Sequence, residues 1–176
     1  MSAMGVLRPS GLVKSLARTS IDAWRGNGKI AVRSRSSHTH NMTEPFLSAL
    51  AEWAARESEM LAVAVVGSHA RGAARADSDV DLVLLVANPE RYFVSADWIK
   101  HFGEICSFRD EDWGRLRSRR VYYASGLEVE FGFSDAAWAS TDPVDPGTKT
   151  VVTGGLLCVY DPQNILRLLA AAVKSH

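Results

Sequence analysis

Closely spaced carboxylates are the clearest chemical feature of this chain. Asp77, Asp79 and Asp81 alternate with other residues just before the aliphatic run Leu82–Ala87. Because residues two apart in a strand point to the same face, we expect Asp79 and Asp81 to project side by side. Neighbouring carboxylates repel each other unless a proton or a cation compensates their charge. Mg²⁺ takes one or two carboxylates and completes its octahedron with phosphate oxygens, so the spacing indicates a metal held against a phosphate.

A Gly-Ser pair upstream offers a place for that phosphate. Gly67-Ser68 follows the apolar run Leu61–Val66 and precedes a short predicted helix, His69–Arg75. Free backbone N–H groups and the helix dipole at a strand-to-helix junction favour phosphate. Gly67 lets the backbone approach the ligand, and the Ser68 hydroxyl adds a donor. With the aspartates, the pair predicts a phosphoryl- or nucleotidyl-transfer site in which a metal clamps the leaving pyrophosphate.

Two other readings of this stretch fail on spacing. An EF-hand calcium loop starting at the first aspartate needs glycine at its sixth position and glutamate at its twelfth. The chain has Leu82 and Asn88 there. Gly67 and Gly72 have the glycine spacing of a P-loop, but Ala73-Ala74 stands where the phosphate-binding lysine and its Ser/Thr neighbour are required.

The stretch resembles the signature of the DNA polymerase β-like nucleotidyltransferases, and most closely that of their small "minimal" nucleotidyltransferase branch, whose motif reads GSxARGxARxxSDxDL. The direct match covers about residues 60–87, and a weaker resemblance extends to Phe133. The matching segments are Gly67-Ser68, Ala70-Arg71-Gly72, Ala74-Arg75 and Ser78-Asp79-Val80-Asp81-Leu82.

The resemblance implies roles for residues of the motif. Nucleotide-binding residues would be Gly67 and Ser68, which would contact the triphosphate, together with Arg71 and Ser78. Asp79 and Asp81 would be catalytic residues that ligate Mg²⁺. A third carboxylate on a neighbouring strand would complete the metal site and help to deprotonate the acceptor hydroxyl.

Two glutamates are candidates for that third carboxylate. Glu128 and Glu130 lie on one face of the predicted strand Leu127–Phe133, opposite an apolar face. The context VEFGF favours Glu130, because it is most similar to the family's apolar-acid-apolar strand, and Glu128 is the alternative. The family usually has aspartate at this position, so the longer glutamate is a departure from its pattern.

Other polar and aromatic residues near the motif have less specific interpretations. Arg71 and Arg75 are expected on one face of the short helix, where Arg75 could pair with phosphate or brace the aspartates. Asp77 is interpreted as a turn residue, and His69 as a packing or surface residue. Tryptophans 98, 113 and 138 could stack on a base or belong to the core, and the arginines at 117, 119 and 120 form a small basic cluster that is solvated or meets an anion.

The predicted elements give a mixed fold. The class is α/β (α+β): a mixed-sheet, polymerase β-like (palm-type) nucleotidyltransferase domain flanked by helices, with residues 42–176 as a single domain. Expected helices are 43–56 with Thr43 as N-cap, 69–75, 95–105, and a last one with Asp161 as N-cap and Pro162 at its first position. Expected strands are 61–66, 80–86, 119–124, 127–133 and 156–160, with loops at 109–114 and 142–147.

Composition narrows the class of partner. The chain has 47% apolar and 23% charged residues, as globular proteins do. Residues 1–41 are basic, Ser-rich and acid-poor, and we interpret them as a disordered extension, a targeting peptide or sequence upstream of a true start at Met42. Residues 42–176 carry thirteen basic and nineteen acidic side chains, a balance of −6, so binding to nucleic acid is not expected. No apolar run approaches the roughly 20 residues of a membrane span, and Cys106 and Cys158, which form no metal motif, suit a reducing cytoplasm.

The sequence therefore predicts an Mg²⁺-dependent nucleotidyltransferase. It would move a nucleoside monophosphate, most simply AMP from ATP, to a hydroxyl of a small molecule or of a partner protein. A toxin-like protein is a possible partner by the same resemblance. The alternative is a module of this fold that binds nucleotide or a partner without catalysis, as an antitoxin-like protein would.

Overall fold

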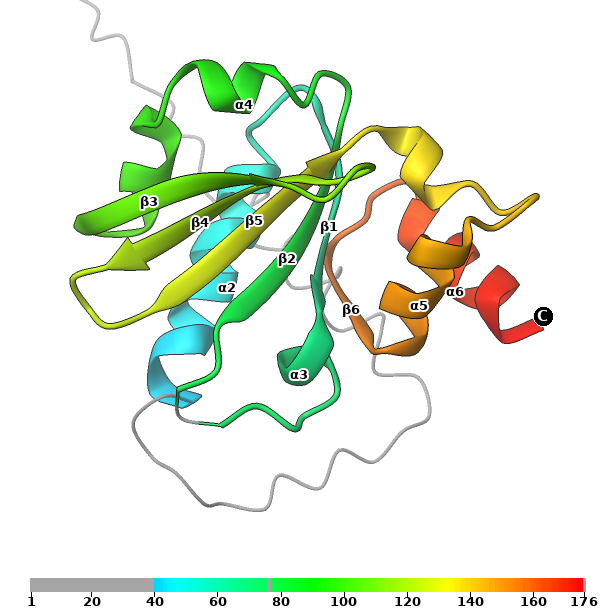
Figure 1. The fold of residues 1–176 in the computed structure, drawn as a ribbon, viewed down its shortest axis with the longest axis horizontal. Coiled ribbons are helices and arrows are strands. Elements are labelled where there is room, and N and C mark those ends of the chain that lie inside the picture. Colours follow the sequence, from blue (N-terminus) through cyan, green and yellow to red (C-terminus); the bar gives the residue numbers. More distant parts are fainter. Residues whose placement is uncertain (1–39, 76, 176) are drawn as a thin grey trace, which may run out of the picture. The chain divides into compact units, whose positions relative to one another are not determined.

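A six-stranded mixed sheet forms the centre of the structure (Figure 1), in the order β3-β4-β5-β2-β1-β6. This computed structural model describes residues 40–75 and 77–175. The central strands β2 and β5 are parallel, and all other neighbouring strands are antiparallel. The strands are β1 (Met60–Val66), β2 (Val80–Val86), β3 (Ile105–Asp112), β4 (Arg117–Tyr123), β5 (Glu128–Ser134) and β6 (Leu156–Tyr160).

Short helices connect and cover these strands. The α-helices are α2 (His40–Ala54), α3 (Gly67–Ala70), α4 (Arg91–Val94), α5 (Pro146–Thr153) and α6 (Ile165–Ser175), and the 3₁₀ helices are η1 (Asp97–Phe102) and η2 (Ala136–Ala139). In the described part of the chain, none of them combines the length and apolar character that crossing a membrane requires. The predicted extension 1–41 lies outside the described residues except for positions 40 and 41, which begin α2.

Each face of the sheet has its own hydrophobic core. On one face, Leu50 and Trp53 of α2 pack with Leu84 of β2 and Phe131 of β5. On the other face, residues of η2, α5 and α6 pack against β1 and β2 through Trp138, Val152, Leu166, Leu169, Val83 and Leu85. Because α5 and α6 lie beside β6 (Figure 1), this second core covers only part of its face. The polar face of β5 is therefore left half-exposed, with Glu128 and Glu130 on it.

The strand and class predictions agree with this sheet. The expected strand 156–160 is β6 with the same bounds, 80–86 is β2, and 61–66 is β1 without its first residue. Strands β1 and β2 are buried on both faces, as their continuous apolar runs indicate. The mixed α/β class with flanking helices is confirmed.

The prediction for residues 95–114 was wrong. Instead of a helix to 105 and a loop at 109–114, the chain has the 3₁₀ helix η1 followed by strand β3. Strand β3 pairs along its length with β4, for example Asp110 with Arg119. Because β3 is an edge strand with mostly exposed side chains, it lacks the apolar alternation from which strands are inferred.

Three helix ends also differ from expectation. The short helix ends at Ala70 rather than Arg75, since Gly72 has a left-handed backbone with a φ of 68°. Thr43 lies inside α2 rather than at its N-cap, and is buried. Helix α6 begins at Ile165 after Asn164, whose φ is 59°, so Asp161 does not directly precede the helix, although its carboxylate accepts a hydrogen bond from the Arg167 N–H of the first turn.

Helix α5 stands partly where a loop was predicted. Asp145 is its N-cap and accepts a hydrogen bond from the Thr148 N–H at 3.0 Å, and Pro146 occupies the first turn. The arrangement predicted for Asp161-Pro162, an aspartate N-cap followed by proline, is thus found at Asp145-Pro146. The dipeptide occurs at both places, and only the tertiary structure selects the one that starts a helix.

Candidate functional site

Three carboxylates converge beside two neighbouring strands, Asp81 on β2, Glu130 on β5, and Asp79 just before β2. Among the described residues, Asp79, Asp81 and Glu130 form a cluster in which one oxygen of each lies within 4.8 Å of the others. Asp81 pairs directly with Glu130 in the parallel register of β2 and β5. Asp79 stands two residues before Asp81, so both point to the same face. We call these three residues the carboxylate cluster.

Glu128, the alternative third carboxylate, lies outside this cluster. It is two residues earlier on β5, and its side chain is 35% exposed against 16% for Glu130. Its Oε1 accepts a hydrogen bond from Arg120 Nη1 at 2.8 Å. The register between β2 and β5 thus sets Glu130, and not Glu128, beside Asp81.

The surroundings of Asp81 disfavour the charged form of its carboxylate. Its pKa is raised from 3.8 to about 6, first because burial removes solvent from the carboxylate and then because Asp79 and Glu130 add negative charge nearby. Arg120 opposes the rise. A carboxylate in this environment gains when a cation neutralises it.

Gly67 makes room for the Asp81 carboxylate. A Cβ on Gly67 would lie 2.8 Å from Asp81 Oδ2, and its φ of 69° is in the left-handed region. Any side chain here would therefore meet both a clash and backbone strain. Helix α3 starts at this glycine, and its N-cap is Val66, whose side chain cannot accept a hydrogen bond. The first amides of α3, including that of Ser68, thus have no side-chain cap.

Arg120 of β4 is the cation that the structure brings to the cluster. Its Nη1 donates to Asp79 Oδ2 at 2.6 Å, and its Nη2 donates to Glu130 Oε2. Burial alone would lower its pKa, but the hydrogen bonds to Glu128 and Asp79 and the charge of Glu130 outweigh this and raise the pKa. Arg120 is therefore a permanent positive charge among these carboxylates.

The donor set fits a hard divalent cation. The cluster presents carboxylate oxygens, the ligands that Mg²⁺ prefers in proteins. Asp79, Glu128 and Glu130 share one guanidinium, and the Asp81 carboxylate lies beside them, so the group keeps an excess of negative charge. That excess, together with the raised pKa of Asp81, is what a bound Mg²⁺ would relieve.

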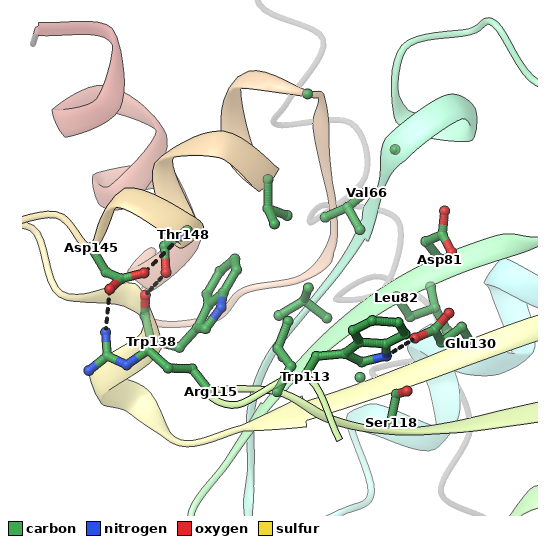
Figure 2. A pocket seen from close by; sticks show the side chains of 17 residues that line it. Val66, Asp81, Leu82, Trp113, Arg115, Ser118, Glu130, Trp138, Asp145 and Thr148 are labelled. Atoms are coloured by element: carbon green, nitrogen blue, oxygen red, sulfur yellow. Dashed lines mark hydrogen bonds and ion pairs between the residues drawn. The ribbon is translucent and has the colours of Figure 1, made fainter. Parts of the chain in front are cut away.

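A pocket of about 500 Å³ adjoins the cluster (Figure 2). Asp81 and Glu130 line one side of it, while Trp138 and Thr148, from η2 and α5, line another. Trp113 lies over it with 64% of its surface exposed, and its Nε1 donates to Glu130 Oε1 at 3.1 Å. The pocket combines apolar walls with carboxylates at one end, an arrangement that suits a ligand with a flat or apolar part and a charged part.

One buried polar group faces no protein partner in this pocket. Ser118 lines it and is 1% exposed, and its Oγ has no hydrogen-bond partner among the described residues. Buried hydroxyls are normally paired. Ser118 is thus a buried hydroxyl beside the pocket that the described residues leave without a hydrogen-bond partner.

The remaining motif residues make local contacts. Arg71 donates its Nη1 to the carbonyl of Gly154, which lines the pocket, and this contact ties α3 to the connection between α5 and β6. Ser78 Oγ accepts the Arg75 N–H at 2.8 Å and closes the turn before β2. Arg75 and Asp77 are exposed, and among the described ion pairs the partner of Asp79 is Arg120 rather than Arg75. His69 Nε2 lies 3.3 Å from the Ser78 carbonyl.

The tryptophans and the basic cluster separate into different environments. Trp98 and Trp138 belong to the two cores, Trp138 also lines the pocket, and Trp113 contacts the carboxylate cluster through Glu130. Arg119 is buried against Asp110, and Arg117 pairs with Glu90 near the surface. The three arginines predicted as one cluster are thus separated, because Arg117 and Arg119 point to one face of β4 and Arg120 points to the other.

Comparison with known proteins places the chain in a family. The streptomycin adenylyltransferase family profile matches residues 41–131, just over half of the 176 residues. No curated protein sequence matches the chain. The family match confirms the predicted nucleotidyltransferase superfamily and, with the observed mixed sheet, the predicted polymerase β-like fold class.

Several solved structures resemble the chain weakly. An aminoglycoside 6-adenyltransferase from Bacillus subtilis has 13% identity and a TM-score of 0.44 over 60% of this chain and 37% of its own. A toxin–antitoxin structure with AMP-PNP has 16% identity and a TM-score of 0.39 over 77% and 83% of the two chains. The apo form of a CCA-adding enzyme has 16% identity and a TM-score of 0.39 over 75% and 32%. The chain thus spans little more than a third of the Bacillus subtilis enzyme.

Proposed function

The chain belongs to the streptomycin adenylyltransferase family, and from this premise we propose that it transfers a nucleoside monophosphate from a nucleoside triphosphate to a hydroxyl group. ATP is the proposed donor and AMP the proposed group transferred. The observation that carries the proposal is the carboxylate cluster beside a pocket, where Asp81 and Glu130 line the pocket wall.

The carboxylate cluster and the start of α3 have different proposed roles. Asp79, Asp81 and Glu130 would hold Mg²⁺, which when bound neutralises charge on the phosphates and on the leaving pyrophosphate. The uncapped amides at the start of α3, with Gly67 and the Ser68 hydroxyl, would donate to the triphosphate. These residues would hold the phosphates beside the carboxylate cluster.

Arg71 and Ser78 retain donors for the nucleotide despite their protein contacts. Only Nη1 of Arg71 is engaged by Gly154, which leaves its other guanidinium donors for phosphate. Ser78 Oγ accepts the Arg75 N–H, and its own hydroxyl hydrogen remains available as a donor. Both therefore remain in the proposed nucleotide-binding set.

Glu130 is the proposed proton acceptor in the transfer step. The acceptor hydroxyl oxygen forms a bond to the α-phosphorus, the bond from that phosphorus to the bridging oxygen breaks, and pyrophosphate leaves with the electron pair. The hydroxyl proton passes to the Glu130 carboxylate. Trp113 donates its Nε1 to Glu130 Oε1 at 3.1 Å and so fixes the orientation of this carboxylate toward the pocket.

A cationic small molecule is the acceptor class to test first. The family takes its name from an enzyme that modifies streptomycin, an aminoglycoside with several positive charges. Residues 42–176 have a formal balance of −6, which complements such a molecule. A hydroxyl of a partner protein, such as a toxin-like protein, is the second proposed acceptor class. The proposed location is the reducing cytoplasm, which Cys106 and Cys158 suit because they form no metal motif.

Labelled ATP tests the proposal directly. The protein is incubated with α-³²P-ATP and Mg²⁺, alone, with a panel of aminoglycosides that includes streptomycin, and with cell lysate. Transfer gives a labelled small molecule on a thin-layer plate or a labelled protein band. Asp79→Asn with Asp81→Asn should abolish the label, and Asp77→Asn, an exposed acid of the same stretch, should keep it.

The opposite results identify the alternative. If no acceptor is labelled although Mg-ATP raises the melting temperature, the chain is a nucleotide-binding module without transfer activity. The ion pairs from Arg120 to Asp79 and Glu130 support this alternative, because they occupy two carboxylates that a catalytic metal would need. Activity retained by the double aspartate variant would refute the proposed metal ligands.

A further inference from the structure

Arg120 reaches the carboxylate cluster from a third strand. It pairs with Glu130 in the antiparallel register of β4 and β5, so both side chains project from the same face. Its side chain is only 15% exposed, and its guanidinium donates to Asp79, Glu128 and Glu130. An arginine held by three carboxylates is a built feature of the site rather than a mobile surface chain.

The arginine engages the groups that a metal would need. Asp79 Oδ2 and Glu130 Oε2 belong to two of the three residues of the cluster, and both accept hydrogen bonds from Arg120. A divalent cation placed among these carboxylates would meet the positive charge of the guanidinium at close range, and like charges at such separations repel. The two cations therefore compete for the same negative groups.

Glu128 can still pair with Arg120 when a metal takes Asp79 and Glu130. Its Oε1 lies 2.8 Å from Arg120 Nη1, and it is outside the cluster. Glu111 adds a further carboxylate 3.7 Å from Arg120 Nε. Arg120 can thus give up Asp79 and Glu130 without being left as a buried charge with no partner.

We propose that Arg120 is a positioning residue that competes with the divalent cation for Asp79 and Glu130, so that the free protein binds the metal weakly and the metal binds well only together with the nucleotide. The inference rests on the proposed function for the identity of the metal and nucleotide. A triphosphate supplies oxygen ligands and negative charge beside the cluster, which favours the metal over the guanidinium. In the metal-free protein, Arg120 keeps the repelling carboxylates together.

Metal binding without nucleotide tests the competition. Free Mn²⁺ is followed by electron paramagnetic resonance during titration into the full chain with no ATP present. Arg120→Gln should bind Mn²⁺ about tenfold more tightly than the wild type, because a unit charge close to the metal is removed. Arg120→Lys keeps the charge and should stay near the wild-type affinity. Arg117→Gln, which removes the same charge from β4 at a site paired with Glu90, should change nothing.

The inference is overturned if Arg120→Gln, folded by circular dichroism, binds Mn²⁺ with unchanged or lower affinity. Because that variant could fail to fold, nitrogen-15 spectra of the arginine side chains in the wild type give a second test. The Arg120 signals should move when Mg²⁺ and a non-hydrolysable ATP analogue are added together, and stay in place with the same concentration of Mg²⁺ alone. An Arg120 signal that is indifferent to both additions would also refute the competition. Neither measurement depends on transfer, so a chain with no transferase activity could still pass both.

Discussion

Asp81 should lower the stability of the metal-free fold, and its replacement by asparagine should raise that stability. The carboxylate has a pKa of about 6 in the folded chain against 3.8 for a free side chain, because it is partly buried beside Asp79 and Glu130. A difference of that size corresponds to about 3 kcal/mol at full effect. Since Asp81 is partly exposed, solvent screening reduces the expected gain for Asp81→Asn to about 1–2 kcal/mol.

The gain must depend on pH in a defined direction. The folded chain holds the Asp81 proton more tightly than the unfolded chain does, so this group favours folding fully below pH 3.8 and loses that contribution as the pH rises through about 6. The stability difference between Asp81→Asn and the wild type should therefore be small below pH 3.8, reach roughly half of its full value at pH 5, and reach its full value at pH 8.

Urea unfolding with EDTA present measures this difference. The two proteins are compared at pH 5 and pH 8, and Asp77→Asn, which neutralises an exposed acid of the same stretch, is the control with little expected change. A variant that is less stable than the wild type at pH 8, or a gap that does not grow from pH 5 to pH 8, would refute the account of Asp81. Loss of transfer in the same stabilised variant would show that the site trades stability for function.

Three further outcomes follow from the same contacts. Gly67→Ala should abolish transfer and destabilise the fold by about 1–3 kcal/mol, because its Cβ would lie 2.8 Å from Asp81 Oδ2. The control Gly72→Ala should keep activity, since Gly72 also has a left-handed φ, of 68°, but a Cβ there would have nothing within 4 Å. Equal activity in the two variants would contradict the steric argument. Arg119→Met should lower the free energy of unfolding, measured with urea, by about 2–3 kcal/mol. The Arg119 side chain is only 3% exposed and donates two hydrogen bonds to Asp110, at 2.7 and 3.0 Å. A decrease of less than about 1 kcal/mol would show that this ion pair contributes little to stability. Mg²⁺ affinity measured by calorimetry with an ATP analogue should fall as the pH drops below about 6 through protonation of Asp81, and a flat profile from pH 5 to pH 8 would exclude Asp81 as a ligand.

Local sequence patterns predict the parts of the site that lie close together along the chain. Asp79 and Asp81 share a face because a strand alternates its side chains, whatever the rest of the fold does. Gly67 comes directly after the apolar strand β1, and its place at the start of a helix follows from that order. The order of the motif residues also carries the family resemblance, which the match over residues 41–131 confirms at the level of the superfamily.

Residues that come from distant strands could not be chosen from the sequence. Glu128 and Glu130 lie on the same face of one strand, and only the parallel pairing of Asp81 with Glu130 distinguishes them. The position of Arg120 depends on the β4–β5 register, and a shift of one residue would turn it to the opposite face. Its neighbours in sequence, Arg117 and Arg119, have the same chemistry and point elsewhere.

Local sequence patterns predict the two aspartates and the phosphate-binding turn, whereas the side chains that surround them follow from the tertiary structure. Strand periodicity and the Gly-Ser pair specify two carboxylates and a phosphate-binding turn, because these depend on neighbours along the chain. The third carboxylate, the guanidinium of Arg120 and the Trp113 wall of the pocket come from β3–β5 and the turns between them. Their places follow from strand pairing and register, which arise from packing across the whole sheet rather than from any local pattern.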